Sequence, residues 1–131
     1  MKQLYLPLLI ILYMVPGVVA TDPIDKVAEL IRQGNTRELS KIFASNVEIT
    51  MLNGEDVYSK TQAGLILDKF FSQNKPVSVK MLHKVNSNPN YLFGVLILNT
   101  QNGPYRIAYT LKDTEGSLML IELRIETEKV K

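Results

Sequence analysis

The fold of this chain is decided by residues 91–126, which read YLFGVLILNTQNGPYRIAYTLKDTEGSLMLIELRIE. Apolar and polar residues alternate through three runs, which is the period of β-strands. Asn102-Gly103 and residues 113–116 separate these runs with residues that favour tight turns. Short turns join neighbouring antiparallel strands. We therefore expect consecutive antiparallel strands at residues 91–101, 104–112 and 117–126.

Upstream of these strands the apolar residues follow the period of helices. Asp22 and Pro23 suit the start of a helix and Gly34 suits its end. A second, shorter helix is expected after Asn35, whose spacing to Glu38 resembles a capping box. The apolar stripes of these two helices are Ile24, Val27, Leu30 and Ile31 in the first, and Leu39, Ile42 and Phe43 in the second.

A third helix and three more strands complete the pattern. Residues 47–52 and 55–58 alternate as two short strands around an Asn53-Gly54 turn. Ser59 and Gln62 then form a capping box that starts a helix ending near Pro76. The apolar stripe of this helix is Leu65, Ile66, Phe70 and Phe71. Residues 77–85 form a further strand before the turn at residues 86–90.

The resulting element order is ααββαββββ, which predicts a single α+β domain. Six strands cannot bury one apolar face unless the three helices cover it. We therefore expect three helices packed in the concave side of a strongly curved, mostly antiparallel six-stranded sheet.

Residues 1–20 have the three parts of a secretory signal peptide. Lys2 gives the N-terminal end a positive charge, and residues 4–15 form an almost unbroken apolar run. Val18-Val19-Ala20 then supplies small or short side chains for a cleavage site. A membrane span needs about 20 apolar residues, which is more than this run contains. We expect cleavage after Ala20, export to the periplasm or the extracellular space, and no membrane contact afterwards. The mature domain then covers residues 21–131.

Composition excludes several kinds of chemistry. The chain has no Cys and one His, so it lacks disulfides, thiolate metal ligands, a Cys nucleophile and any His-pair metal motif. The net charge is +2, from 15 Lys and Arg against 13 Asp and Glu, which does not favour nucleic-acid binding. We expect no metal or other cofactor and no nucleic-acid partner.

Three segments give the chain a family resemblance: VYSKTQA (57–63), DKFF (68–71) and IELRIE (121–126). Together with the element order, they resemble the nuclear-transport-factor-2-like superfamily, the cone-shaped fold shared with ketosteroid isomerase. Within it the chain is most similar to a secreted bacterial family of unknown function. The resemblance covers residues 23–128 and implies the fold, but it does not imply an activity because this superfamily hosts unrelated functions.

The residues do not support the chemistry of the superfamily's isomerases. Ketosteroid isomerases use a Tyr on the first helix and two Asp residues, one of them protonated on the sheet. The first helix here has no Tyr, and no Asp falls within the predicted long strands apart from their turns. The dehydratase branch pairs His with Asp, and His83 is the single His. We name no catalytic residue, and these absences favour a non-catalytic protein.

Turn geometry predicts the pairing of the long strands and hence their faces. Gln101 is expected opposite Pro104, and Asp113 opposite Ser117. The face packed on the helices should then carry Leu96, Leu98, Tyr105, Ile107, Tyr109, Leu111, Met119, Ile121, Leu123 and Ile125. A one-residue bulge would exchange the faces beyond it.

The opposite face of the sheet is predicted to have an apolar centre and a polar end. Its members are Phe93, Val95, Ile97, Asn99, Arg106, Ala108, Thr110, Leu118, Leu120, Glu122 and Arg124. A monomer does not usually leave such an apolar sheet in water, and the superfamily resemblance implies a dimer formed through this face. We expect a homodimer with these residues, except Thr110, at its interface. Arg106, Glu122 and Arg124 are expected to form ion pairs, with an anionic ligand on the Arg side chains as the alternative.

Tyr105, Tyr109 and His83 are the candidate residues for binding a small molecule. The two tyrosines are predicted to point toward the helices, where their hydroxyls would reach a cone-mouth cavity or would serve as the polar rim of the core. His83 is predicted to share a face with Val79, Met81 and Val85, as a pocket acid–base group or as a hydrogen-bonding interface residue.

The sequence leaves three functional hypotheses. The first is an exported, non-catalytic binding or scaffolding domain of the cell envelope that forms a homodimer. The second is a carrier of a small hydrophobic or anionic ligand in the cone cavity. The third is an enzyme resembling the isomerases or dehydratases. A filled interior would favour the first, and a cavity with converging polar groups would favour the second.

Overall fold

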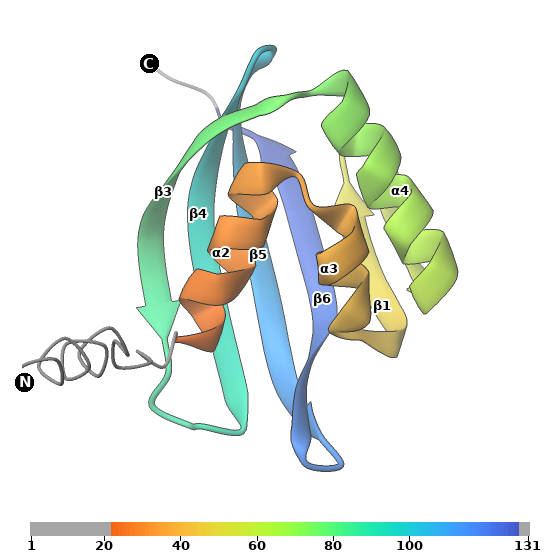
Figure 1. Cartoon of the computed structure of the whole chain (residues 1–131), viewed down its shortest axis with the longest axis vertical. Coiled ribbons are helices and arrows are strands. Elements are labelled where there is room, and N and C mark those ends of the chain that lie inside the picture. Colours follow the sequence, from red (N-terminus) through yellow and green to blue (C-terminus); the bar gives the residue numbers. More distant parts are fainter. Residues whose placement is uncertain (1–21, 129–131) are drawn as a thin grey trace, which may run out of the picture.

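The structure, a computed structural model, describes residues 22–128 (Figure 1), so the leader and its predicted cleavage site lie outside the described residues. The first helix, α2 (Pro23–Gln33), has the predicted ends. Asp22 caps it by accepting a 2.7 Å hydrogen bond from the Ile24 N–H. Gly34 ends it with a φ of 65°, a left-handed conformation that favours a residue without Cβ.

The second helix, α3 (Thr36–Lys41), is shorter than its apolar stripe predicts. Asn35 caps the Glu38 N–H at 3.1 Å as expected, but the helix ends at Ile42. The Ile42 carbonyl accepts a 2.7 Å hydrogen bond from the Leu120 N–H of the sheet. Phe43 therefore begins strand β1 (Phe43–Met51), and it is a core residue of this strand instead of a helix.

Strand β2 (Gly54–Ser59) returns beside β1 and leads into α4 (Lys60–Gln73). The last pair of the hairpin is Met51 with Gly54, so the turn centres on residues 52–53, one residue earlier than predicted. The capping box at the start of α4 is confirmed. Leu65 of its predicted stripe is 66% exposed, while the buried residues of α4 are Ala63, Gly64, Leu67, Phe70 and Phe71. No helix between residues 22 and 128 is long and apolar enough to cross a membrane.

Six strands form one open sheet in the order β2-β1-β6-β5-β4-β3. The long strands are β3 (Pro76–Val85), β4 (Tyr91–Thr100), β5 (Gly103–Thr114) and β6 (Ser117–Thr127). Neighbouring strands pair antiparallel, except that β1 and β6 are parallel. All three helices cover one side of the curved sheet (Figure 1), which confirms the predicted fold. We name the helix-covered side the inner face and the opposite side the outer face.

The β4–β5 hairpin closes one residue earlier than predicted. Thr100 pairs with Gly103, so Asn99 lies opposite Pro104, and the expected juxtaposition of Asn99 with Arg106 is wrong. Each residue of β4 therefore pairs with the residue of β5 two positions away from its predicted partner, and two is an even number. The predicted alternation between inner and outer face is therefore preserved in both strands.

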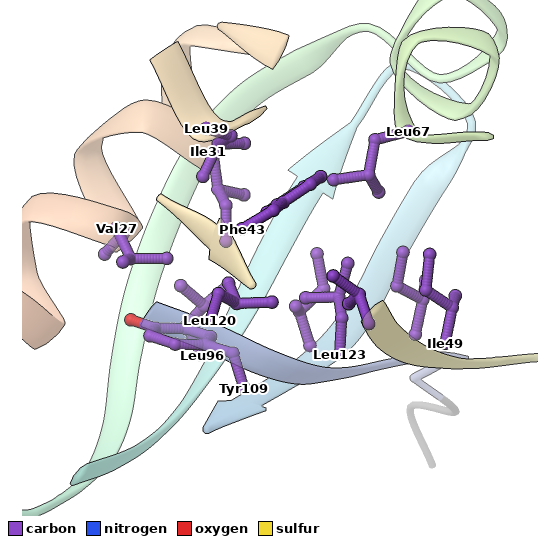
Figure 2. Close-up of a cluster of buried hydrophobic side chains, with 14 of the residues drawn as sticks. Val27, Ile31, Leu39, Phe43, Ile49, Leu67, Leu96, Tyr109, Leu120 and Leu123 are labelled. Carbon is purple, nitrogen blue, oxygen red and sulfur yellow. The ribbon is translucent and has the colours of Figure 1, made fainter. Parts of the chain in front are cut away.

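Over the first half of β6 the two faces are exchanged, because Ser117 pairs with Thr114 and not with Asp113 as predicted. A β-bulge at Ile121 then restores the predicted faces beyond it. The extra residue lies between the Leu111–Leu120 pair and the Thr110–Glu122 pair. Because side chains alternate with a period of two, one extra residue reverses their direction. The placement of Leu118 and Leu120 on the outer face is therefore wrong. Both pack on the helix side, and Leu120 is 1% exposed within the core (Figure 2).

The shift at the turn and the bulge also move two residues that were expected in the core. Met119 pairs with Lys112 and belongs to the outer face. Ile121 lies at the bulge beside Glu122 and is half-buried. Beyond the bulge, Leu123 and Ile125 return to the predicted inner face and are buried.

Strand β3 has its own bulge at Leu82, which separates His83 from its predicted neighbours. Val79 and Met81 pack against the core. After the bulge His83 pairs with Val95, and its position is therefore on the outer face. The predicted common face of Val79, Met81 and His83 is wrong for this reason.

The core brings α2 into close contact with β4 and β5. The Tyr109 ring lies near Val27, Leu96 and Leu120, and its hydroxyl points toward α2 (Figure 2). A Cβ on Gly94 would lie 2.7 Å from Ile24 Cγ2 and 2.9 Å from the Tyr109 ring. Only glycine permits this close approach of helix and sheet.

Both edges of the sheet carry features that hinder further strand pairing. On β2, the Asp56 carboxylate accepts a 2.8 Å hydrogen bond from the N–H of its neighbour Val57. On β3, Pro76 lacks an N–H and the register shifts near Val77 and Leu82. Bulges, proline and charged side chains are the usual means by which a sheet edge is protected.

Candidate functional site

The space between the helices and the inner face is filled by side chains. The enclosed volume bounded by α2, α3, α4 and the central strands is about 10 Å³, which leaves room for at most one water molecule. Its lining is wholly apolar: Ile31, Leu39, Leu67, Phe71, Ile107, Leu120, Leu123 and Ile125. This interior therefore does not form the cone cavity in which a small ligand was expected.

Tyr109 is a structural residue of this core. Its hydroxyl donates a 2.7 Å hydrogen bond to the backbone oxygen of Ile24 in the first turn of α2. Burial, together with the nearby carboxylates of Asp25 and Asp22, raises the pKa of Tyr109 well above its ordinary value. The hydroxyl is both buried and bonded, and the predicted ligand-binding role of Tyr109 is not supported by this position.

Tyr105 lies outside the sealed core, at the open end between α4 and the sheet. Its hydroxyl donates a 2.9 Å hydrogen bond to Asn74 Oδ1, which also accepts a 3.0 Å bond from Asn102 Nδ2. Asn74 Nδ2 in turn donates to the Phe70 carbonyl at 3.0 Å. The Phe70 and Tyr105 rings pack edge to face with centroids 5.0 Å apart. This bonded cluster holds the end of α4 against β5.

His83 does not join the two tyrosines. It is exposed on the outer face of β3, whereas Tyr105 and Tyr109 belong to the helix side of β5. The three predicted ligand residues therefore do not form one site. Within residues 22–128, no group of three or more His, Asp or Glu side chains is placed to hold a metal ion.

A groove opens at the surface between α4 and the β1–β2 turn. It consists of two adjoining hollows of about 360 and 330 Å³ that share Met51, Asn53 and Phe70. The first hollow is completed by Leu52, Asn74, Tyr105 and Ile125, and the second by Tyr58, Ile66, Lys69 and Gln73. We name this feature the hairpin groove. Apart from Tyr105, none of its residues was predicted as a ligand-binding residue, and Leu52 was predicted within a strand and not in the turn where the structure places it.

The outer face has an apolar centre that keeps the predicted residues of β4 and β5, loses Leu118 and Leu120 of β6, and gains Val85 of β3. We name this centre the outer apolar patch, and it consists of Val85, Phe93, Val95, Ile97 and Ala108. Phe93 is 37% exposed, whereas Val95 is 7% exposed because its neighbours on the sheet cover it. Tyr91 and Met119 extend the patch at one end. The patch is therefore continuous but only partly open to solvent.

Charged residues border the outer apolar patch on β5 and β6. Arg106 Nε lies 3.0 Å from Glu128 Oε1, and Arg124 Nη1 lies 3.3 Å from Glu126 Oε2. The Glu128 carboxylate raises the pKa of Arg106. Glu122 accepts a 3.2 Å hydrogen bond from Thr110. The predicted ion-pair interpretation is supported for both arginines, although Glu126 and Glu128 are their partners instead of Glu122.

Comparison with known proteins places these features in a family. The model of a family described as a domain of unknown function, DUF4783, matches residues 24–126. No curated protein matches the chain.

Three solved structures illustrate the similarity. A DUF4783 family protein from Bacteroides uniformis is 23% identical with a TM-score of 0.78, covering 83% of this chain and 100% of that one. A second one, from Bacteroides ovatus, is 23% identical with a TM-score of 0.75, covering 79% and 94%. A nuclear-transport-factor-2-like protein of unknown function from Shewanella baltica is 12% identical with a TM-score of 0.61, covering 81% and 88%. At these identities the structures share the fold.

Proposed function

Because the chain belongs to the DUF4783 family and has a nuclear-transport-factor-2-like fold, we propose that it is a non-catalytic binding and scaffolding domain of the cell envelope that works as a homodimer. The leader at residues 1–20 supports export. The family assignment itself carries no activity, so the case depends on the sites described above.

The filled interior supports a non-catalytic role. Enzymes and carriers of this size usually hold a small substrate in a cavity of about 300 Å³ or more, whereas the enclosed core space is about 10 Å³. The Tyr109 hydroxyl, a candidate group for ligand binding, is already bonded to a backbone oxygen. These two observations also weigh against a carrier that encloses its ligand in the cone.

The outer apolar patch is the single observation that carries the homodimer. Under two-fold symmetry such a patch can pack against its own copy. A stable interface buries about 800 Å² per partner, which is more than the exposed parts of five side chains supply. The contact must therefore extend to the bordering ion pairs of Arg106 and Arg124. We expect dissociation in the micromolar range because a small apolar centre with a polar rim gives limited net affinity.

Sedimentation tests this proposal directly. The mature protein, measured between about 1 and 100 µM, should change from monomer to dimer. Ile97→Asp should remain monomeric because the dimer would have to bury two added carboxylates in its apolar centre. Leu65→Asp is the matched control, since Leu65 is exposed on α4, away from the patch.

Circular dichroism should show that each variant keeps the wild-type fold. A wild-type protein that stays monomeric at the highest concentration would refute the homodimer. A dimer unaffected by Ile97→Asp would show that another surface forms the interface.

A further inference from the structure

We propose that the hairpin groove binds an anionic amphiphile, with the apolar chain between Met51, Phe70 and Ile125 and the carboxylate beside Lys69. The groove opens on the helix side of the sheet, whereas the outer apolar patch is on the opposite face. The inference is therefore independent of the proposed homodimer.

The hollow beside Tyr105 suits the apolar part of a ligand. Its walls include Met51, Phe70 and Ile125, and Leu52 stands at its rim with 72% of its surface exposed. An isolated domain gains nothing by holding such a side chain in water, and an apolar ligand in the hollow would cover it. The volume of about 360 Å³ is within the range of small-molecule sites.

The polar groups at the base of this hollow are already satisfied. Asn74 Oδ1 accepts hydrogen bonds from both Tyr105 and Asn102, and Asn74 Nδ2 donates to the Phe70 carbonyl. A polar ligand group placed there would have to replace these bonds, at a cost in desolvation. The apolar end of a ligand therefore fits this hollow better than its head group.

The adjoining hollow supplies the partner for a charged head group. Lys69 is the single charged residue among the eleven that line the two hollows. Within residues 22–128 the ion pairs of the structure do not include Lys69. The amides of Asn53 and Gln73 lie in the same lining and can donate further hydrogen bonds. Because the lining contains one cationic side chain and no carboxylate, the groove should bind an anionic head group in preference to a cationic one.

Nuclear magnetic resonance titration with sodium decanoate tests the proposal, using the isotope-labelled mature protein below the micelle concentration. Decyltrimethylammonium bromide is the matched probe, since it has the same chain length and the opposite charge. Decanoate should shift the backbone amide signals of residues 51–53, 66, 69, 70 and 73. It should bind at least about tenfold more tightly than decyltrimethylammonium.

Two variants of α4 define the role of charge. Lys69→Glu should weaken decanoate binding by about tenfold or more, because it places a like charge beside the carboxylate. Lys60→Glu is the matched control: it makes the same change on the same helix, outside the lining of the groove. It should bind decanoate as the wild type does.

Gln73→Trp provides a further variant that does not alter charge. Gln73 is exposed, so the indole can enter the groove without disturbing the core, and it should abolish the decanoate shifts. Equal binding of the two probes, equal effects of Lys69→Glu and Lys60→Glu, or shifts confined to the outer apolar patch would each overturn the proposal. A monomeric protein that still binds decanoate in the groove would refute the homodimer and support this inference.

Discussion

At the scale of single residues, the most constrained contact is the one where Gly94 faces Ile24 and Tyr109. The helix, the glycine and the tyrosine hydroxyl depend on one another, because the 2.7 Å bond from Tyr109 to the Ile24 oxygen exists only if α2 lies close to β4. A glycine within a strand normally weakens it. Here the stability that Gly94 costs the strand is offset by the close packing of α2, which a larger side chain would hold further from the sheet.

Gly94→Ala should lower the free energy of unfolding by about 1–3 kcal/mol, because the added methyl overlaps Ile24 and the Tyr109 ring. Gly64→Ala is the control, since its Cβ would meet a rotatable hydroxyl, Ser40 Oγ, at 2.8 Å. A better helix propensity, worth about 1 kcal/mol, offsets that contact. Urea unfolding of both variants measures the difference. If Gly94→Ala were as stable as the wild type, α2 would be able to move away from β4 without cost in free energy.

A second residue-scale feature is the pairing of Lys84 with Asp22 and Asp25, at 3.2 and 2.9 Å. Burial acts to raise the pKa of Asp22, but the Ile24 N–H and Lys84 together lower it below its ordinary value of 3.8. A carboxyl with a lowered folded-state pKa contributes stability above the unfolded-state pKa. This stability is lost as the pH falls through the folded-state value.

We expect the unfolding free energy to decrease as the pH falls below about 4, and Asp22→Asn to show a smaller decrease. The Asn side chain can still accept the bond from the Ile24 N–H, so the helix cap remains. Asp68→Asn, on the exposed side of α4, is the matched control. Urea unfolding between about pH 2 and 7 measures this dependence. If Asp22→Asn and the wild type lose stability in parallel, the ion pair has no part in acid sensitivity.

At the scale of elements, strand β6 decides which side chains form the core. The bulge at Ile121 allows Leu118 and Leu120 to point inward in one half of the strand, and Leu123 and Ile125 in the other half. A bulge also increases local twist, which is consistent with the curvature of the sheet around the helices (Figure 1).

Leu120→Ala should destabilise the protein by about 2–5 kcal/mol, because it removes a buried side chain and leaves a cavity. Met119→Ala should cost less than about 1 kcal/mol, since Met119 lies half-buried on the outer face. Thermal or urea unfolding measures both. A larger effect of Met119→Ala than of Leu120→Ala would support the regular register expected from the turn alone.

The sequence predicts the existence and type of every element, but not the phase of the strands. Capping residues such as Asp22, Asn35 and Ser59 act within one turn of helix, and each is confirmed. The three hairpin turns near Gly54, Gly103 and Gly116 differ from the predicted pairing by one residue, although all three glycines have a positive φ. The bulges at Leu82 and Ile121 lie within pairs of consecutive strands, and the alternation of residue types does not mark the extra residue.

At the scale of the whole molecule, the two candidate surfaces lie on opposite sides of one sheet. The β4 and β5 residues of the outer apolar patch were predictable because they follow the alternation of these strands, whereas Val85 of β3 was not. The hairpin groove was not, because it combines the β1–β2 turn, α4 and the ends of β5 and β6. Such a site depends on where elements meet in space, and only Tyr105 was indicated by its residue type.

The proposed signal peptide also belongs to the scale of the whole molecule, since export determines in which compartment a domain acts. We expect the exported protein to begin at Thr21, next to the Asp22 cap of α2. Intact-mass and peptide mass spectrometry of the exported fraction measures this. Ala20→Leu should retain the leader, because a large side chain does not fit the last position before cleavage. A wild-type protein that keeps Met1 after export would contradict the predicted cleavage.

The protected edges of β2 and β3 should affect the aggregation of this protein at high concentration. The Asp56 carboxylate occupies the outward N–H of Val57, and Pro76 removes another donor on the opposite edge. An incoming extended chain therefore loses one donor on each edge, which hinders its addition to the sheet and the growth of fibres. Concentrated stocks should stay clear during long storage, and seeds that nucleate amyloid should fail to recruit the folded domain.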